Sequence, residues 1–126
     1  MASMGININD SAEKWTEFLL TGKKTIETRN TNSLKPYIGK VMGIIRTGVG
    51  KAHLVGIVRL GEPIVYATLE QFRADADRHG IEEGSGYDWK GCKYGYPVEV
   101  LHRLEKPAPV ESLGIIARKI TPYEVH

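Results

Sequence analysis

Residues 22–29 read GKKTIETR, a stretch that alternates charged and β-branched side chains after a glycine. The β-branched residues favour an extended strand, in which Ile26 points to one face while Glu27 and Arg29 point to the other. Lys24 stands at the turn before this strand, from where its side chain can reach toward Glu27. The pattern by itself is compatible with an exposed edge strand that carries an ion pair, or with the wall of a binding site.

A lysine, a glutamate and an arginine in this arrangement supply groups for catalysis or binding. Lys24 is a candidate nucleophile or base, and Glu27 is a candidate carboxylate for proton transfer. Arg29 supplies a fixed cation for a phosphate or an oxyanion. We therefore predict Lys24 and Glu27 as catalytic residues and Arg29 as a substrate-binding residue, against the alternative of a surface ion pair.

A second candidate region is the segment 87–96, YDWKGCKYGY, which we predict to be a loop. It holds four of the chain's ten aromatic residues, including Tyr96, with lysines and glycines between them. Aromatic faces with interleaved cations suit stacking on nucleobases and pairing with phosphates, although the rings can equally pin the loop to the core. Just before it, Glu82 and Glu83 belong either to the mouth of a site or to a solvated turn. The substrate-binding residues predicted here are Tyr87, Trp89, Lys93 and Tyr94.

The rest of the chain reads as one domain, residues 1–126, with several strands and few helices. Asp10 and Glu13 have capping-box spacing ahead of a first helix that Gly22 ends, and Thr68 and Gln71 have the same spacing ahead of a second. This mixture with tight turns predicts a small α+β barrel rather than a doubly wound sheet. The other predicted elements are a hairpin of strands 41–47 and 53–60, a helix 68–79, a strand 97–106 and a short strand 114–120.

The charge of the chain is distributed unevenly. Its net charge is +2, but residues 14–59 hold nine Lys or Arg and two Asp or Glu, whereas residues 60–126 hold eight and eleven. A basic segment of this kind can mark a surface that faces phosphates, or it can be a solvated face.

The composition argues against several classes of protein. The single cysteine, Cys92, excludes an intramolecular disulfide and a thiolate zinc cluster, and the dispersed histidines suggest no ligand pair, so we expect no metal and no cofactor. No apolar run approaches the roughly 20 residues of a membrane span, and there is no signal-peptide pattern, so we expect a cytoplasmic protein without a membrane partner. A monomer is expected. Met1 to Ser3 precede a second Met-Gly pair, and we interpret them as a cloning remnant.

Gly22, Lys24, Glu27 and Arg29 match the signature G-x-K-x-x-E-x-R, and with this match the chain resembles the ASCH domain family of the PUA-like superfamily. The order of elements agrees over most of residues 5–120. The resemblance implies a small closed β-barrel with two or three flanking helices and a cleft lined by the motif, to which Gly22 would contribute as a substrate-binding residue.

The family is associated with binding of RNA or nucleotides, and some members are hydrolases, either ribonucleases or N4-acetylcytidine amidohydrolases. Lys24 matches the lysine proposed as catalytic in the amidohydrolases, which tend to have a threonine where this chain has Glu27.

Three hypotheses follow from the sequence. The first is a domain that binds single-stranded RNA, a nucleotide or a nucleoside in a cleft lined by Lys24, Glu27 and Arg29. The second is a metal-independent hydrolase of the ribonuclease or amidohydrolase type. The third is a non-catalytic regulatory module that binds a protein.

Overall fold

The computed structural model describes residues 2–110 and 117–123 of the chain. Strands and short helices alternate irregularly along these residues, which confirms the predicted α+β class. The elements are β1 (Ala2–Asn9), α1 (Trp15–Thr21), β2 (Ile26–Arg29), a 3-10 helix (Lys35–Tyr37), β3 (Val41–Thr47), β4 (His53–Leu60), β5 (Ile64–Tyr66), α2 (Leu69–Ala74), α3 (Ala76–His79), β6 (Lys93–Pro109) and β7 (Ala117–Tyr123).

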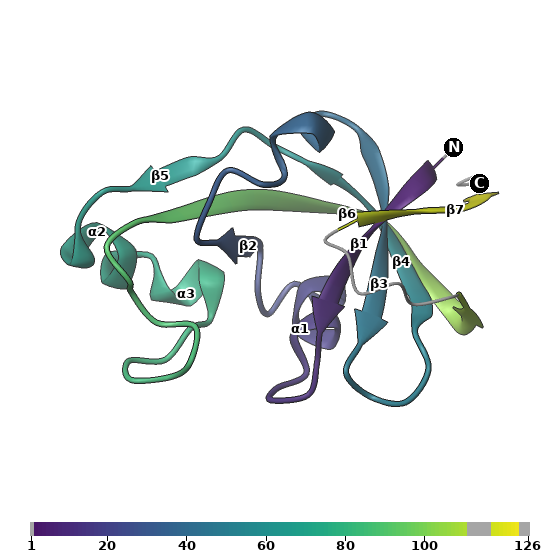
Figure 1. Ribbon diagram of the computed structural model, residues 1–126, viewed down its shortest axis with the longest axis horizontal. Helices are drawn as coiled ribbons and strands as arrows, with labels where there is room; N and C mark the ends of the chain where they lie inside the picture. Colours follow the sequence, from purple (N-terminus) through teal and green to yellow (C-terminus); the bar gives the residue numbers. More distant parts are fainter. Residues whose placement is uncertain (1, 111–116, 124–126) are drawn as a thin grey trace.

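All the strands belong to one sheet with the order β2-β6-β4-β3-β1-β7, and β5 pairs with β6 beside this path. The pairs are antiparallel except for β1 and β3, which run parallel. Figure 1 shows the sheet strongly twisted, with α2 and α3 at the end where β2, β5 and the first part of β6 lie. The pairings of the described residues form a curled half-barrel, and they do not show the closed barrel that the resemblance implies.

The predicted hairpin is confirmed, since β3 and β4 pair antiparallel over the expected residues. Ile44 and Ile45 at its centre are 1% and 0% exposed, and they join core clusters on opposite faces of the sheet. Gly56 of β4 lies so close to α1 that a Cβ atom there would be 2.4 Å from a methyl group of Leu20. The hairpin therefore has an apolar layer on both faces, one of them partly covered by α1.

α1 begins later than its sequence pattern predicts. The residue before the helix is Lys14, and Glu13 makes no capping box with Asp10. The Asp10 carboxylate instead reaches forward and accepts hydrogen bonds from the backbone N–H (3.1 Å) and the hydroxyl (2.5 Å) of Thr16. Asp10 thus caps the first turn of α1 although it lies six residues before Thr16, farther away in the chain than an ordinary N-cap residue.

The second predicted helix is present but interrupted. The capping box between Thr68 and Gln71 is confirmed, and α2 follows it. Asp75 separates α2 from α3, and its carboxylate accepts hydrogen bonds from Arg78 and from the Tyr66 hydroxyl. A polar side chain that binds both a neighbouring helix turn and a strand favours the break over a continuous helix.

β6 begins at Lys93, so the prediction of a loop over residues 87–96 is wrong in its last part. Gly95, a turn signal in the sequence, lies in this strand between β2 and β5. A Cβ atom at Gly95 would lie 2.7 Å from the Tyr66 ring and 2.8 Å from Ile26, so the glycine permits close packing rather than a turn.

The sequence pattern does not predict β1 and β5. β1 depends on its long-range parallel pairing with β3, and β5 contains only Ile64 to Tyr66. Of the predicted last strand, residues 114–116 lie outside the described residues, whereas Ala117–Tyr123 forms β7 and pairs with β1.

Candidate functional site

The motif stretch forms the end of α1, a tight turn and the edge strand β2. Gly22 has a φ of 82° where α1 ends, and the Lys24 N–H donates to the Phe18 carbonyl at 2.9 Å, which ties the turn to the helix. β2 is at one end of the strand order, and Ile26, 1% exposed, anchors it in the core. Lys24 and Glu27 are nevertheless 2% and 9% exposed. The stretch is therefore an edge strand and the wall of a cavity at the same time.

Three groups surround the Lys24 ammonium. Nζ donates to the backbone carbonyl of His79 at 2.5 Å, lies 3.9 Å from Glu27 Oε1 and lies 5.1 Å from the centre of the Trp15 ring. Burial lowers the pKa of Lys24; the Glu27 charge acts in the opposite direction, and two neighbouring cations add to the lowering. A lysine with a lowered pKa has a larger neutral fraction, which is the form that acts as a nucleophile or base.

The carbonyl that holds Lys24 belongs to a tightly packed turn. His79 is 0% exposed and stacks on Phe72, with ring centroids 4.1 Å apart. The Ile81 N–H donates to its Nδ1 at 2.9 Å, so the proton of the neutral ring is on Nε2, which donates to the Phe72 carbonyl at 2.7 Å. Burial lowers the pKa of His79 and so favours this neutral form.

Arg29 connects two distant strands of the curled sheet. Its Nη2 donates to Glu27 Oε2 and to the Asn7 carbonyl of β1, each at 3.1 Å. Because β6, β4 and β3 separate β2 from β1 in the sheet, this contact depends on the curl. The Nε atom of Arg29 is buried and has no hydrogen-bond partner among the described residues.

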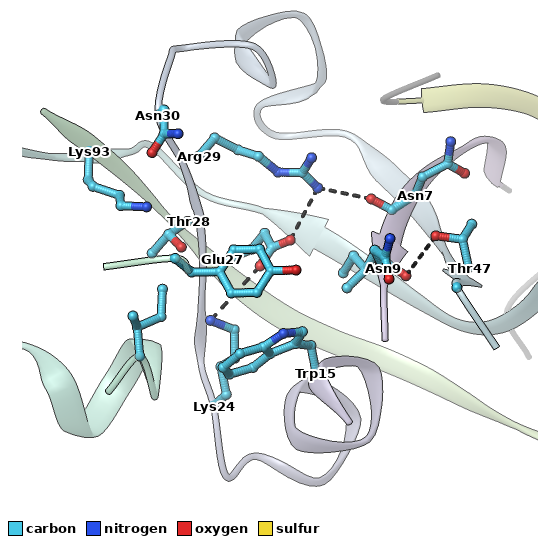
Figure 2. Close-up of a pocket in the computed structure, with 14 residues that line it drawn as sticks. Asn7, Asn9, Trp15, Lys24, Glu27, Thr28, Arg29, Asn30, Thr47 and Lys93 are labelled. Carbon is cyan, nitrogen blue, oxygen red and sulfur yellow. Dashed lines mark hydrogen bonds and ion pairs between the residues drawn. The ribbon is translucent and has the colours of Figure 1, made fainter. Parts of the chain in front are cut away.

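A cavity of about 570 Å³ lies between β1, β2 and α1, and we name it the β2 cavity (Figure 2). Trp15 and Tyr87 form an aromatic corner in it, with ring centroids 5.8 Å apart and planes at 88°. Its volume and its mixture of aromatic and polar walls are typical of a site for a small molecule. The lining residues are Asn7, Ile8, Asn9, Trp15, Lys24, Glu27, Thr28, Arg29, Asn30, Thr47, Gly48, Ile81, Tyr87 and Lys93.

Lys93 is the third cation of the β2 cavity, after Lys24 and Arg29. It is 3% exposed, and Figure 2 shows its ammonium group directed into the cavity. Its Nζ lies 5.8 Å from the centre of the Phe72 ring, and none of the ion pairs among the described residues includes Lys93. Burial lowers the pKa of Lys93, and the charge of Lys90 lowers it further.

The structure brings most of the predicted site residues to this one cavity, but not Gly22, Trp89 or Tyr94. Trp89 packs against Phe72, with ring centroids 6.0 Å apart, and Tyr94 packs against the main core. Tyr96 is 0% exposed, so the stacking role considered for it is wrong. These rings stabilise the fold, as the alternative interpretation of the aromatic segment expects.

Glu82 and Glu83 are exposed and do not line the β2 cavity, although the adjacent Ile81 does. Glu83 lies 3.4 Å from Arg73 on the surface. Their positions agree with the solvated turn rather than with the mouth of the site.

Several lining residues were not identified from the sequence as candidates. Trp15 has the helical spacing of a core residue, and it does pack against the core, but one side of it faces the β2 cavity. Asn7 and Asn9 belong to β1, the strand that the sequence pattern does not predict. Thr47 and Gly48 lie at the end of β3. The pairing of β1 with β3 places the polar side chains of Asn7, Asn9 and Thr47 beside one another, on the side of the cavity that faces β2.

Over residues 2–110 and 117–123, no group of three or more His, Cys, Asp and Glu side chains is arranged to hold a metal ion. No helix within the same residues is long and apolar enough to cross a membrane.

No family profile and no curated protein matches the chain by sequence. Its structure, however, is similar to the crystal structure of ASCH from Zymomonas mobilis, with a TM-score of 0.61 and 16% identity over 86% of this chain and 72% of the other. The S128A mutant of the Zymomonas mobilis protein gives a TM-score of 0.63 and 16% identity over 94% and 87% of the two chains. The fold is that of an ASCH domain. The predicted resemblance is thus confirmed in the fold, and the ASCH fold positions the motif residues along the β2 cavity.

Proposed function

We propose that the β2 cavity binds single-stranded RNA or a nucleotide. The observation that carries this proposal is the charge of the cavity, in which Lys24, Arg29 and Lys93 face a single carboxylate, Glu27. A buried excess of cations attracts phosphate. The ASCH fold supports the proposal, because the family is associated with binding of RNA or nucleotides.

The walls of the cavity provide the remaining contacts. Trp15 and Tyr87 stand at right angles, so a base can stack on one ring and touch the edge of the other. Asparagine side chains of β1 and of the segment after β2, Asn9 and Asn30, line the same space. Amide groups can donate to and accept from the edges of an unpaired base.

Binding of a fluorescently labelled, single-stranded RNA, measured by anisotropy over a range of salt concentrations, tests the proposal. Arg29→Gln removes one cation from the cavity, and we expect about tenfold weaker binding and a salt slope reduced by about one. Arg103→Gln is the matched control, because Arg103 is a half-exposed arginine outside the cavity. The proposal is wrong if the wild type does not bind, or if both variants change the affinity and the slope equally.

A second candidate function, a metal-independent hydrolase, is favoured by the surroundings of Lys24. This buried amine has a lowered pKa and lies 3.9 Å from Glu27, which can exchange a proton with it. The assay incubates the protein in EDTA with N4-acetylcytidine, and separately with labelled RNA. Turnover by the wild type but not by Lys24→Ala would support the hydrolase, and equal rates for the two would contradict it for these substrates.

A further inference from the structure

Lys93 differs from the other two cations of the β2 cavity in that no carboxylate of the described residues forms an ion pair with it. Lys24 Nζ is held by the His79 carbonyl with Glu27 nearby, and Arg29 is held by Glu27. The carboxylates whose charges act on Lys93 are Asp88 and Glu27. Each of these carboxylates has an arginine as a closer partner, and Lys93 is therefore left as a cation available to a ligand.

Asp88 is 2.8 Å from Arg73, and Glu27 is 3.1 Å from Arg29. Both carboxylates are therefore already held by an arginine. A largely covered ammonium without a close carboxylate is costly, which means that an anion entering the cavity would relieve an existing cost.

The charge balance also indicates what kind of anion would match. The three cations and one carboxylate leave a formal excess of two positive charges among the lining residues. An internal phosphodiester carries one negative charge and would leave one cation unmatched. A terminal phosphomonoester carries close to two negative charges at neutral pH, since its second pKa is about 6, and it supplies three acceptor oxygens.

We propose that the β2 cavity recognises the terminal phosphomonoester of a nucleotide or of an RNA end, and that Lys93 is the residue that contacts this phosphate. The inference rests on the proposed function and makes it narrower: an end or a mononucleotide is bound, rather than the middle of a strand. Tyr87 and Trp15, which line the same cavity, then contact the base attached to that phosphate.

The test compares four ligands by calorimetry at one salt concentration: uridine 5′-monophosphate, uridine 3′-monophosphate, uridine and a short oligouridylate with hydroxyl groups at both ends. We expect at least one monophosphate to bind about tenfold or more tightly than uridine, as hydrogen bonds to charged groups predict. The two monophosphates distinguish which end of an RNA is recognised. The oligouridylate shows whether phosphodiesters alone are sufficient.

Lys93→Met tests the assignment of the residue, and Lys106→Met is its control on the exposed part of the same strand. We expect Lys93→Met to reduce the preference for the monophosphate over uridine to less than about threefold, whereas Lys106→Met retains it and Lys93→Arg restores part of it. Thermal unfolding of each variant shows whether it is folded.

The outcomes separate the two proposals. If the hydroxyl-ended oligouridylate binds at least as tightly as both monophosphates, the phosphomonoester inference is wrong while RNA binding stands. If none of the four ligands binds, both proposals are wrong. If Lys93→Met keeps the preference for the monophosphate, the assignment to Lys93 is wrong.

Discussion

Two cavities of comparable size differ in what they can bind. The β2 cavity has a volume of about 570 Å³, and a second one of about 460 Å³, here named the α1 groove, lies between α1 and the strands β3, β4 and β6. The α1 groove contains two arginines, Arg46 and Arg103, and two glutamates, Glu17 and Glu105, so its charges balance. Arg103 lies 2.6 Å from Glu17, and these two side chains are 50% and 48% exposed.

The difference shows that two cavities of similar volume in this protein have different charge balances. In the α1 groove, Arg103 and Glu17 neutralise one another where both side chains are half-exposed to water, although the Nε atom of Arg46 is buried without a hydrogen-bond partner among the described residues. In the β2 cavity the cations are mostly covered and outnumber the carboxylate. Positive charge therefore remains that a bound anion can neutralise, and this attraction would stabilise the complex. Each prediction below would strengthen or remove this contrast.

The largest effect is expected from removing the single carboxylate of the β2 cavity. Glu27→Gln leaves buried Lys24 and Arg29 without a counter-charge, and we expect the free energy of unfolding to fall by about 3–5 kcal/mol. Glu17→Gln, which breaks the half-exposed pair in the α1 groove, should cost only about 0–1 kcal/mol. Urea unfolding measures both. Equal losses would show that the two cavities do not differ electrostatically.

A smaller effect is expected at the turn after β3, which borders only the β2 cavity. Gly48 has a φ of 80°, and a Cβ atom there would lie 2.1 Å from Asn9 Oδ1. Gly50, with a φ of 64°, has no atom that such a Cβ would meet within 4 Å. We expect Gly50→Ala to destabilise by about 1 kcal/mol through its backbone conformation alone.

Gly48→Ala should cost about 1 kcal/mol more than Gly50→Ala, because Asn9 must move and its Oδ1 then loses the hydrogen bond that it accepts from the Ser11 N–H. RNA binding should weaken only in Gly48→Ala, since Asn9 lines the β2 cavity. Unfolding and anisotropy measurements on both variants decide the point. Identical behaviour of the two variants would mean that Asn9 adapts without cost.

The third prediction concerns pH, because the buried His79 holds Lys24 of the β2 cavity through its carbonyl, whereas no histidine among the described residues lines the α1 groove. The folded pKa of His79 is lowered, so below about pH 6.5 the unfolded chain binds more protons than the folded one. Stability should therefore fall as the pH drops from 6.5 toward the folded pKa, by at most about 1.4 kcal/mol per pH unit.

Chemical unfolding between pH 7 and 5 measures this dependence. His79→Gln has no titrating ring, and its stability should change less over the same range. A wild-type stability that stays constant down to pH 5 would contradict the lowered pKa.

The smallest effect is a gain in stability. Lys93→Met replaces the unpaired buried ammonium by an apolar side chain of similar length, and we expect the ligand-free protein to become more stable by about 0.5–2 kcal/mol. Lys106→Met, at an exposed position of the same strand, should stay within about 0.5 kcal/mol of the wild type. Thermal unfolding checks both, and a loss of stability in Lys93→Met would show that Lys93 has a structural role.

The parts of the site that could be predicted from sequence are those whose residues lie close together in the chain. Glu27 and Arg29 alternate along the short strand β2, and Lys24 lies in the turn just before it, so local spacing is enough to group them. Lys93 and Tyr87 were identified as candidates by the composition of their segment, although the assumed loop is partly a strand. Neither the local spacing in GKKTIETR nor the composition of residues 87–96 shows that Arg29 reaches the Asn7 carbonyl. Neither shows that Lys93 lacks a paired carboxylate among the described residues.

The amino-acid sequence alone determined the local elements: the hairpin of β3 and β4, the capping box at Thr68, the glycine stop at Gly22 and the alternation of β2. Each depends on residues close together in the chain, whose propensities and spacing act without distant partners. Tertiary structure decided that the edge strand β2 is also a cavity wall. The curl of the sheet brings β1 opposite β2 and covers Lys24 and Glu27, and both results depend on which distant strands pair. Lys93 is left unmatched because Arg29 and Arg73 hold the carboxylates near it.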